Sequence, residues 1–274
     1  MRVTVAVDNL ALNGLAIEHG LSFFVETRNG SVLFDTGQSG NWLDNLRQLG
    51  KDPATLQAVS LSHGHYDHSG GVSTAVECID SIRCYSHPDV FNKRYTADSD
   101  NVRVIGMPDE SLQYQSRFTL NRVPLEIIPG VTLSGEILIR NESAIIVRGK
   151  FFLDAQSRNP DTFKDEQCLI LQEKDSFGVL LGCSHCGVEN NILAAMDAAG
   201  TDRLEWVAGG MHLASASDEQ LDDLCVFLKS KDIGRVICCH CTGSTAFQYL
   251  QNSMGDMVIQ GYAGMEWSLP ESKI

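Results

Sequence analysis

The chain has 274 residues, 43% of them hydrophobic, and a formal net charge of −14. This length suits one large domain or two small ones, and the hydrophobic content is ordinary for a globular core. The acidic balance argues against nucleic acid as a partner, because phosphate would be repelled over most of the surface. We expect no membrane span either, since no stretch approaches about 18 consecutive apolar residues.

The first strand predicted in the chain covers 2–8, where apolar and polar residues alternate. No apolar signal segment precedes it, so we expect a cytoplasmic protein. Residues 21–27 and 31–35 indicate a hairpin across Asn29-Gly30, a strong turn dipeptide. A helix is predicted over 41–49 from the spacing of its Trp and Leu residues.

The middle of the chain is less regular. Strands are predicted over 57–62 and 82–86, with a helix beginning near Ser69. Residues 89–121 are polar and weakly periodic, and we expect a helix plus irregular structure that covers the substrate. Further strands are predicted over two short apolar runs, 125–128 and 144–148. A hairpin turn is predicted at Arg148-Gly149-Lys150, at the end of the second run.

The second half alternates strands and helices. A hairpin is predicted across Lys174-Asp175. The two strands of this hairpin are 167–173 and 178–183. Helices are predicted at 189–198, 218–230 and 243–252, and further strands at 204–208, 235–239 and 257–260. With no linker and no repeat of fixed period, we expect a single domain over 1–274.

The strand at 57–62 leads into His63-Gly64-His65-Tyr66-Asp67-His68, with three histidines and one aspartate in six residues. His63 and His65 point the same way if the chain is extended there. Asp67 and His68 come where the chain turns, so they can face a second point. Imidazoles with one carboxylate suit zinc, iron or manganese better than calcium or magnesium. One loop could therefore supply ligands to two metal ions.

Further histidines follow predicted strands in distant segments, each beside glycine: His185, His212 and His240. Glycine lets the backbone approach a shared centre. We expect these histidines to converge with the early loop at one edge of the sheets.

The nine cysteines are an odd number, and we expect no disulfide framework. Five of them fall late in the chain: Cys183, Cys186, Cys238, Cys239 and Cys241. A structural zinc site among these five is one alternative. The preferred interpretation places them at strand ends beside the histidines.

The loop at 63–68 resembles the signature of the metallo-β-lactamase superfamily, and Asp35-Thr36-Gly37 matches its upstream Asp-Thr-Gly. Four further segments resemble a subgroup similar to the methanopterin-pathway ribofuranosylaminobenzene phosphate synthase: 18–22, 182–187, 209–213 and 240–243. The resemblance covers nearly the whole chain. It implies an αββα sandwich, in which two packed sheets are flanked by helices.

The resemblance also implies two metal ions, but the chain departs from the usual ligands. No histidine lies between His87 and His185, and Cys183 stands where an aspartate usually bridges the metals. We expect His63, His65 and His185 to hold the first ion and Asp67, His68 and His240 the second. Cys183 is either a bridging thiolate or a neutral core thiol, and His87 is the weaker alternative to His185.

Other residues receive roles from the same resemblance. His212 is expected to be unligated and to donate a proton or contact phosphate, or else to be a buried, hydrogen-bonded residue. Asp35 is expected to hydrogen-bond a ligating histidine; its alternative role is capping a turn. Glu18 and His19 would rim the site. His87, Lys93 and Arg94 would bind an anionic tail or remain solvated.

The preferred function is a metal-dependent hydrolase of a small, anionic, phosphorylated or ester-like metabolite. Asp67 and His212 are the expected catalytic residues. We expect two divalent ions as cofactors, with zinc preferred and manganese or iron as alternatives. A condensing synthase acting on a pterin and a ribosyl-aminobenzene phosphate is the second hypothesis. A sensor that binds metal or metabolite without catalysis is the third. A homo-oligomer is compatible with all three.

Overall fold

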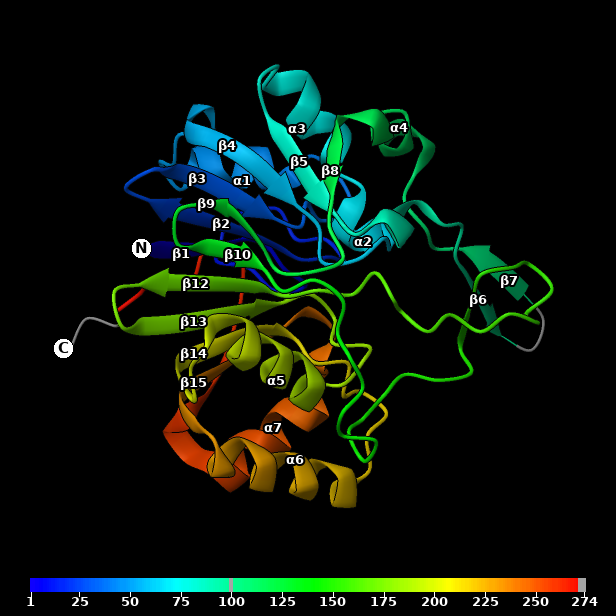
Figure 1. The fold of residues 1–274 in the computed structure, drawn as a ribbon, viewed down its shortest axis with the longest axis vertical. Coiled ribbons are helices and arrows are strands. Elements are labelled where there is room, and N and C mark those ends of the chain that lie inside the picture. The colour runs from blue at the N-terminus through cyan, green and yellow to red at the C-terminus, as the bar shows by residue number, and fades with distance from the viewer. Residues whose placement is uncertain (99–100, 271–274) are drawn as a thin grey trace.

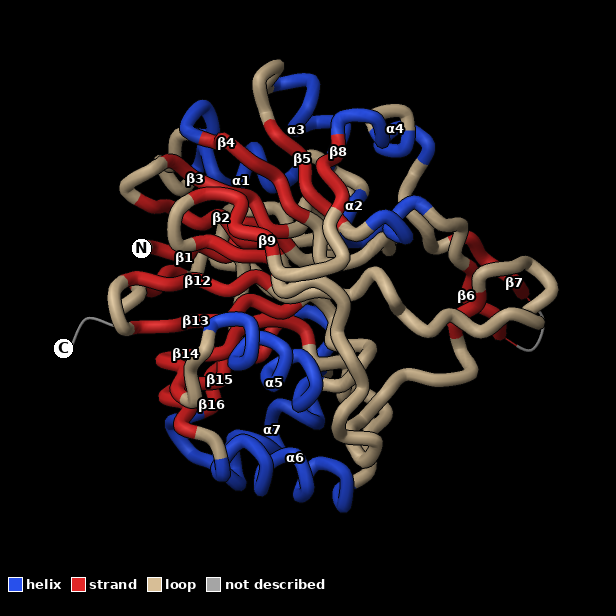
Figure 2. Tube along the Cα trace, in the orientation of Figure 1, coloured by secondary structure: helices blue, strands red, loops and turns tan. Residues whose placement is uncertain are grey.

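The computed structural model describes residues 1–98 and 101–270. Two seven-stranded β-sheets pack face to face at its centre, with helices on both outer faces (Figures 1 and 2). The first half of the chain forms most of one sheet and the second half most of the other. The expected αββα sandwich is confirmed.

The first sheet carries helices α1 (Asn41–Gln48) and α3 (Val72–Cys78) on its outer face. Strands β3, β4, β5 and β8 are parallel to one another. The antiparallel pairs are β17 with β1, β1 with β2, and β2 with β3. In spatial order the strands are β17 (Glu266–Ser268), β1 (Arg2–Val7), β2 (Ser22–Thr27), β3 (Gly30–Phe34), β4 (Leu56–Ser60), β5 (Arg83–Ser86) and β8 (Phe118–Leu120).

The second sheet carries helices α5 (Val188–Ala199), α6 (Asp218–Ser230) and α7 (Ser244–Met254) on its outer face. Strands β13 to β16 are parallel, and the others pair antiparallel. In spatial order the strands are β16 (Val258–Gln260), β15 (Asp232–Cys239), β14 (Arg203–Gly210), β13 (Ser176–Leu181), β12 (Leu169–Glu173), β10 (Val131–Leu133) and β9 (Leu125–Ile128).

The core has three apolar layers, one between the sheets and one under the helices of each outer face. The strands deliver side chains to alternate faces, so a single strand feeds two layers. In β2, for example, Phe23 belongs to the central layer and Phe24 to the layer under α1, and both are fully buried. This packing fixes the two sheets against each other.

The parallel strands determine where the site lies. The carboxyl ends of parallel strands meet at one edge of a sheet, which is where open α/β sheets bind ligands. Asp35 follows β3 and the loop at 61–68 follows β4, whereas Cys183, His212 and His240 follow β13, β14 and β15. The two sheets meet closely here, because a Cβ on Gly182 would lie 2.2 Å from Ser62 Oγ.

The segment 89–121 differs from the sequence-based expectation of a helix with irregular structure. It contains strands β6 (Tyr95–Asp98) and β7 (Asn101–Val104), a short helix α4 (Asp109–Leu112), and β8. Strand β6 pairs with β7 and with β11 (Phe151–Phe152), and this small sheet projects from the body of the molecule (Figure 1). We call β6, β7 and β11 the arm.

The strand predicted over 144–148 is wrong, because these residues form loop and turn. Ile145 and Val147 nevertheless pack against the core of the second sheet, which explains their apolar character. Helix α2 (Tyr66–Ser69) is a single turn that begins inside the histidine-rich loop. Helix α3 begins at Val72, three residues after Ser69, near which the sequence predicted a helix to begin. None of the described helices combines the length and apolar character needed to cross a membrane.

Candidate metal centre

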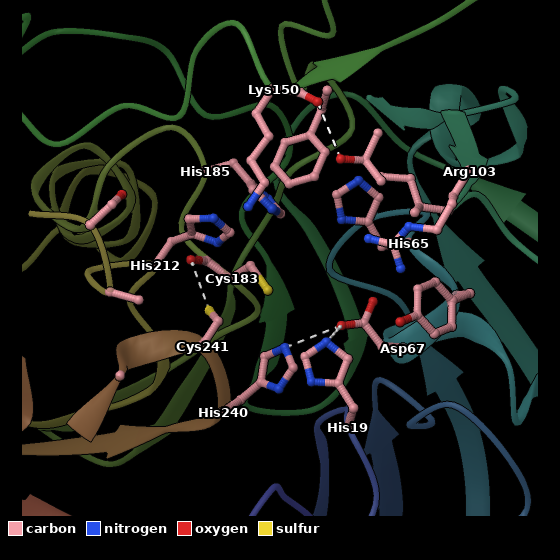
Figure 3. Close-up of a pocket in the computed structure, with 17 residues that line it drawn as sticks. His19, His65, Asp67, Arg103, Lys150, Cys183, His185, His212, His240 and Cys241 are labelled. Atoms are coloured by element: carbon pink, nitrogen blue, oxygen red, sulfur yellow. Dashed lines mark hydrogen bonds and ion pairs between the residues drawn. The ribbon is translucent and has the colours of Figure 1, made fainter. Parts of the chain in front are cut away.

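The histidines of the two sheets converge on one cavity of about 470 Å³. Figure 3 shows His65 and Asp67, which come from the loop after β4, facing His185, His212 and His240 from the second sheet. The convergence predicted from the strand-end histidines is therefore present in the structure.

The residues expected at the first ion lie together. His63 Nε2 is 3.1 Å from His65 Nδ1, and the His185 ring centroid lies 4.8 and 4.9 Å from those of His63 and His65. His63, His185 and Cys183 also offer ligand atoms within 4.8 Å of one another. These side chains are all buried, so an ion among them would be screened little by solvent.

The residues expected at the second ion also lie together. His240 Nε2 is 3.3 Å from Asp67 Oδ2, and His68 Nε2 is 3.9 Å from the same oxygen. His19 approaches this carboxylate as well, at 3.2 Å. His19 thus lies beside a proposed ligand, and its half-exposed side chain lines the cavity, as a rim position implies.

Cys183 joins the two groups. Its Sγ is 3.1 Å from His68 Nε2, and it shares one cluster with His63 and His185 and another with His68 and His240. A thiolate at this position would touch both sets of ligands. The bridging role and the alternative of a neutral core thiol both remain predictions. Without a bound cation, burial raises the pKa of the Cys183 thiol well above its usual value.

His87 does not join either group. Its Nε2 is 2.9 Å from Glu136 Oε1 and 3.0 Å from Arg122 Nη1. Arg94 is neither solvated nor available to bind an anionic tail, because its guanidinium is buried in ion pairs with Asp161 and Asp165.

Polar partners orient four histidines of the site, the first being His63, whose Nδ1 lies 2.8 Å from Ser62 Oγ. His68 Nδ1 lies 2.7 Å from Asp35 Oδ2, which also accepts a hydrogen bond from Ser62 Oγ. His185 Nδ1 lies 3.2 Å from Glu166 Oε1, and His240 Nδ1 lies 2.9 Å from Asn9 Oδ1. Histidines that bind metals usually have such partners on the other ring nitrogen.

The sequence analysis anticipated Asp35 but missed the partners of His185 and His240. Glu166 accepts hydrogen bonds from the backbone N–H groups of His185 and Cys186, and Asp8 accepts one from that of His240. Glu166 lies in an irregular segment with no recognisable motif. A buried carboxylate of this kind carries no signal in a single sequence.

The donor set fits divalent cations. His65 Nε2 is buried and has no hydrogen-bond partner, although a buried polar atom normally has one. Burial and the neighbouring histidines hold the pKa of His63 well below its usual range, so this imidazole stays neutral. Burial opposes ionisation of Asp67, but His68 and His19 together hold the pKa of its carboxyl well below its usual range. His63 and Asp67 are therefore already in the forms that bind metal, a neutral imidazole and an ionised carboxylate. Against the effect of burial, Asp35 and Asp67 raise the pKa of His68 to about 9, so His68 would release its proton on binding.

Backbone strain is concentrated at the same place. Four residues of the site have positive φ: Asp35 at 58°, Ser184 at 61°, His212 at 50° and His240 at 48°. Such conformations cost about 1–3 kcal/mol each for residues other than glycine and cluster at functional sites. They turn the chain sharply at the strand ends and so aim the side chains inward.

Two cationic side chains line the exposed side of the cavity. Arg103 comes from β7 of the arm and Lys150 precedes β11, and both point into the cavity in Figure 3. Among the side chains of residues 1–97 and 101–270, no carboxylate lies within salt-bridge distance of either cation. Lys150 Nζ lies 5.6 Å from the centre of the Phe151 ring, which also lines the cavity.

Comparisons with known proteins agree with the fold. A family model described as the metallo-beta-lactamase superfamily matches residues 17–142. Tm1679, a solved structure described as a metal-dependent hydrolase of the beta-lactamase superfamily, is 31% identical, with 98% of each chain covered and a TM-score of 0.81. Zn²⁺-bound PqqB from Methylobacterium extorquens shares the fold at 13% identity and a TM-score of 0.58, over 98% of this chain and 100% of its own.

A curated relative has a synthase activity. The chain is 27% identical over 245 residues to the 7,8-dihydropterin-6-methyl-4-(beta-D-ribofuranosyl)-aminobenzene-5'-phosphate synthase of Methanocaldococcus jannaschii, with 84% of this chain and 82% of the relative covered.

Proposed function

Because this chain belongs to the metallo-β-lactamase superfamily, we propose that it is a metal-dependent hydrolase of a small phosphorylated or ester-like metabolite. The observation that carries the proposal is that one cavity holds histidine groups that could bind a metal ion together with two cations, Arg103 and Lys150, that have no carboxylate partner among the described side chains. The chain as a whole has a net charge of −14. Unpaired positive charge in such a chain points to an anionic ligand.

We assign His63, His65 and His185 to one divalent ion and Asp67, His68 and His240 to another, with Cys183 between them. Zinc suits this donor set best, and manganese or iron are alternatives. When bound, the ions supply Lewis-acid chemistry, which lowers the pKa of water and neutralises charge developing on phosphoryl or carbonyl oxygens.

The side chains of the protein position the substrate. Arg103 and Lys150 pair with the phosphate, and this fixes the reacting end of the molecule against the histidine cluster. Tyr66 and Phe151 line the same cavity and offer apolar contact for the rest of the substrate. The cavity, at about 470 Å³, matches the size range of small-ligand pockets.

The relationship to the M. jannaschii synthase favours a second candidate, a synthase that joins a pterin to a ribosyl-aminobenzene phosphate. A phosphorylated substrate would use the same two cations, so the cavity alone does not choose between the reactions. A panel of phosphodiesters, phosphomonoesters and thioesters, run beside pterin and ribosyl-aminobenzene phosphate mixtures, distinguishes them by product. Elemental analysis of protein purified without added metal identifies the bound ions.

The substrate class is tested at Arg103 and Lys150. Replacing either with alanine should raise KM for a phosphorylated substrate about tenfold and leave KM for an uncharged ester unchanged, since a hydrogen bond to a charged group is lost. Arg148→Ala is the matched control, because Arg148 is exposed two residues from Lys150 and does not line the cavity. Equal effects on charged and uncharged substrates would contradict a phosphate-binding role.

A further inference from the structure

Cys241 is a second thiol in the cavity to which the proposed function gives no role. It follows His240 in a short helical turn at the end of β15, and its Sγ lies 3.7 Å from the carbonyl oxygen of Cys183. The two cysteines and His212 offer ligand atoms that all lie within 4.8 Å of one another. Figure 3 shows these three side chains grouped on the same side of the cavity.

The three residues come from adjacent parallel strands. Cys183 follows β13, His212 follows β14 and Cys241 follows β15, so the pairing of the strands itself brings them into register. Gly210, at the end of β14, leaves room for the thiol, because a Cβ there would lie 2.7 Å from Cys241 Sγ. The grouping thus follows from the register of the three strands, since each of the three residues lies two positions beyond a strand end.

His212 itself has an unsatisfied polar atom. Its Nδ1 is buried and has no hydrogen-bond partner. A buried nitrogen without a partner is uncommon in a folded protein and needs an explanation, such as an ion. Two thiols and an imidazole form the donor set that thiophilic divalent cations prefer over oxygen-rich sites.

We propose that Cys183, His212 and Cys241 form a thiol-rich site for a thiophilic divalent cation, beside the two groups of histidines described above. The site shares Cys183 with those groups and adds two residues that neither of them uses. It makes His212 a ligand, in place of the unligated role expected from the sequence. The inference concerns cation binding alone and holds whichever reaction the protein catalyses.

The test is cobalt binding by the full chain, stripped with chelator and reloaded with Co²⁺ under reducing conditions. Thiolates bound to Co²⁺ give a charge-transfer absorption in the near ultraviolet, and elemental analysis counts the ions retained after desalting. We expect Cys241→Ser to lose one equivalent of Co²⁺ and part of the charge-transfer intensity. His212→Gln should lose the same equivalent, and the remaining equivalents should stay bound in both variants.

Cys78→Ser is the matched control, because Cys78 is an exposed cysteine at the end of α3 and should leave the spectrum and the count unchanged. Circular dichroism and thermal unfolding verify folding, and Cys241→Ala repeats the test without a hydroxyl that could bind metal. An unchanged count and spectrum in Cys241→Ser and Cys241→Ala would overturn the proposal. Loss of every equivalent would also overturn it, since the three residues would then not form a separate site. Activity is not part of the readout, so failure of the proposed hydrolase leaves this result interpretable.

Discussion

At the scale of single residues, the hydrogen-bond partner of each histidine is as important to the site as the histidine itself. Asp35 accepts hydrogen bonds from the Ser62 backbone N–H and from Ser62 Oγ, and it faces His68 Nδ1. It therefore fixes both the orientation and the ionisation of His68. Burial lowers the pKa of His68, but Asp35 and Asp67 outweigh it and raise this pKa to about 9.

Asp35→Asn should lower metal affinity about 10–100-fold while the fold is retained, as for other partners of ligating histidines. Asparagine tolerates the positive φ of 58° at this position, so the backbone need not move. Competition with a chromophoric chelator measures the affinity. Asp52→Asn, at an exposed turn before β4, is the control and should bind metal like the unmodified protein. Unchanged affinity in Asp35→Asn would show that Asp35 only shapes the turn.

The sequence indicated the contiguous candidate ligands because His63, His65, Asp67 and His68 fall in one short motif at the end of a strand. It could not identify Glu166 or Asn9, since each is a lone polar residue outside any motif, and Asn9 lies at the other end of the chain from His240. It favoured His185 over His87, and the structure places His185 beside His63 and His65 while His87 contacts Glu136.

At the scale of elements, a buried ion-pair network connects the arm with the loop at 61–68 that follows β4. Arg94 precedes β6 and is only 1% exposed, with its guanidinium 2.8 Å from Asp161 and 2.7 Å from Asp165. Asp165 also accepts a hydrogen bond from the backbone N–H of Gly64, between His63 and His65. The network thus connects the arm, which carries Arg103, with the residues proposed to bind metal.

Arg94→Met should destabilise the protein by about 3–5 kcal/mol, because it leaves two buried carboxylates without their positive partner. Urea unfolding measures the change. Lys93→Met is the matched control, since Lys93 is the exposed neighbour of Arg94 and should have a small effect. A loss in Arg94→Met no larger than in Lys93→Met would mean that water, and not the guanidinium, neutralises the two carboxylates.

The elements predicted correctly are those with strong local signals. The turn at Asn29-Gly30 joins β2 to β3, and α6 begins at a capping box formed by Ser217 and Gln220. Strands β10, β17 and β11 were missed because they have three residues or fewer and exist only through their partners. The run at 144–148 has the composition of a strand, but it packs as a loop whose Val147 N–H bonds the carbonyl of His185.

At the scale of the whole molecule, the proposed metal centre lies at the junction of the two sheets. The loop after β4 contributes one set of ligands and the ends of β13 and β15 contribute the other. Without cations, this junction buries several imidazoles and thiols close together. Bound ions should therefore hold the two sheets together as well as support chemistry.

Removing metal with a chelator should lower the free energy of unfolding, by about 2.7 kcal/mol if the free ion had been present at a hundredfold excess over its Kd. Thermal unfolding before and after treatment shows the change, and readdition of zinc should restore it. Chelator saturated with zinc beforehand is the control and should have no effect. Identical unfolding curves would mean that the sheets pack independently of the ions.

The order of the ligands along the chain has a consequence for biosynthesis. His63 to His68 leave the ribosome long before His185 and His240, and each of the two ions proposed at the histidines needs residues from both groups. A cation captured by the early loop of a nascent polypeptide would have an incomplete coordination shell and would exchange readily. Stable loading of the cofactor must therefore wait until translation has passed Cys241.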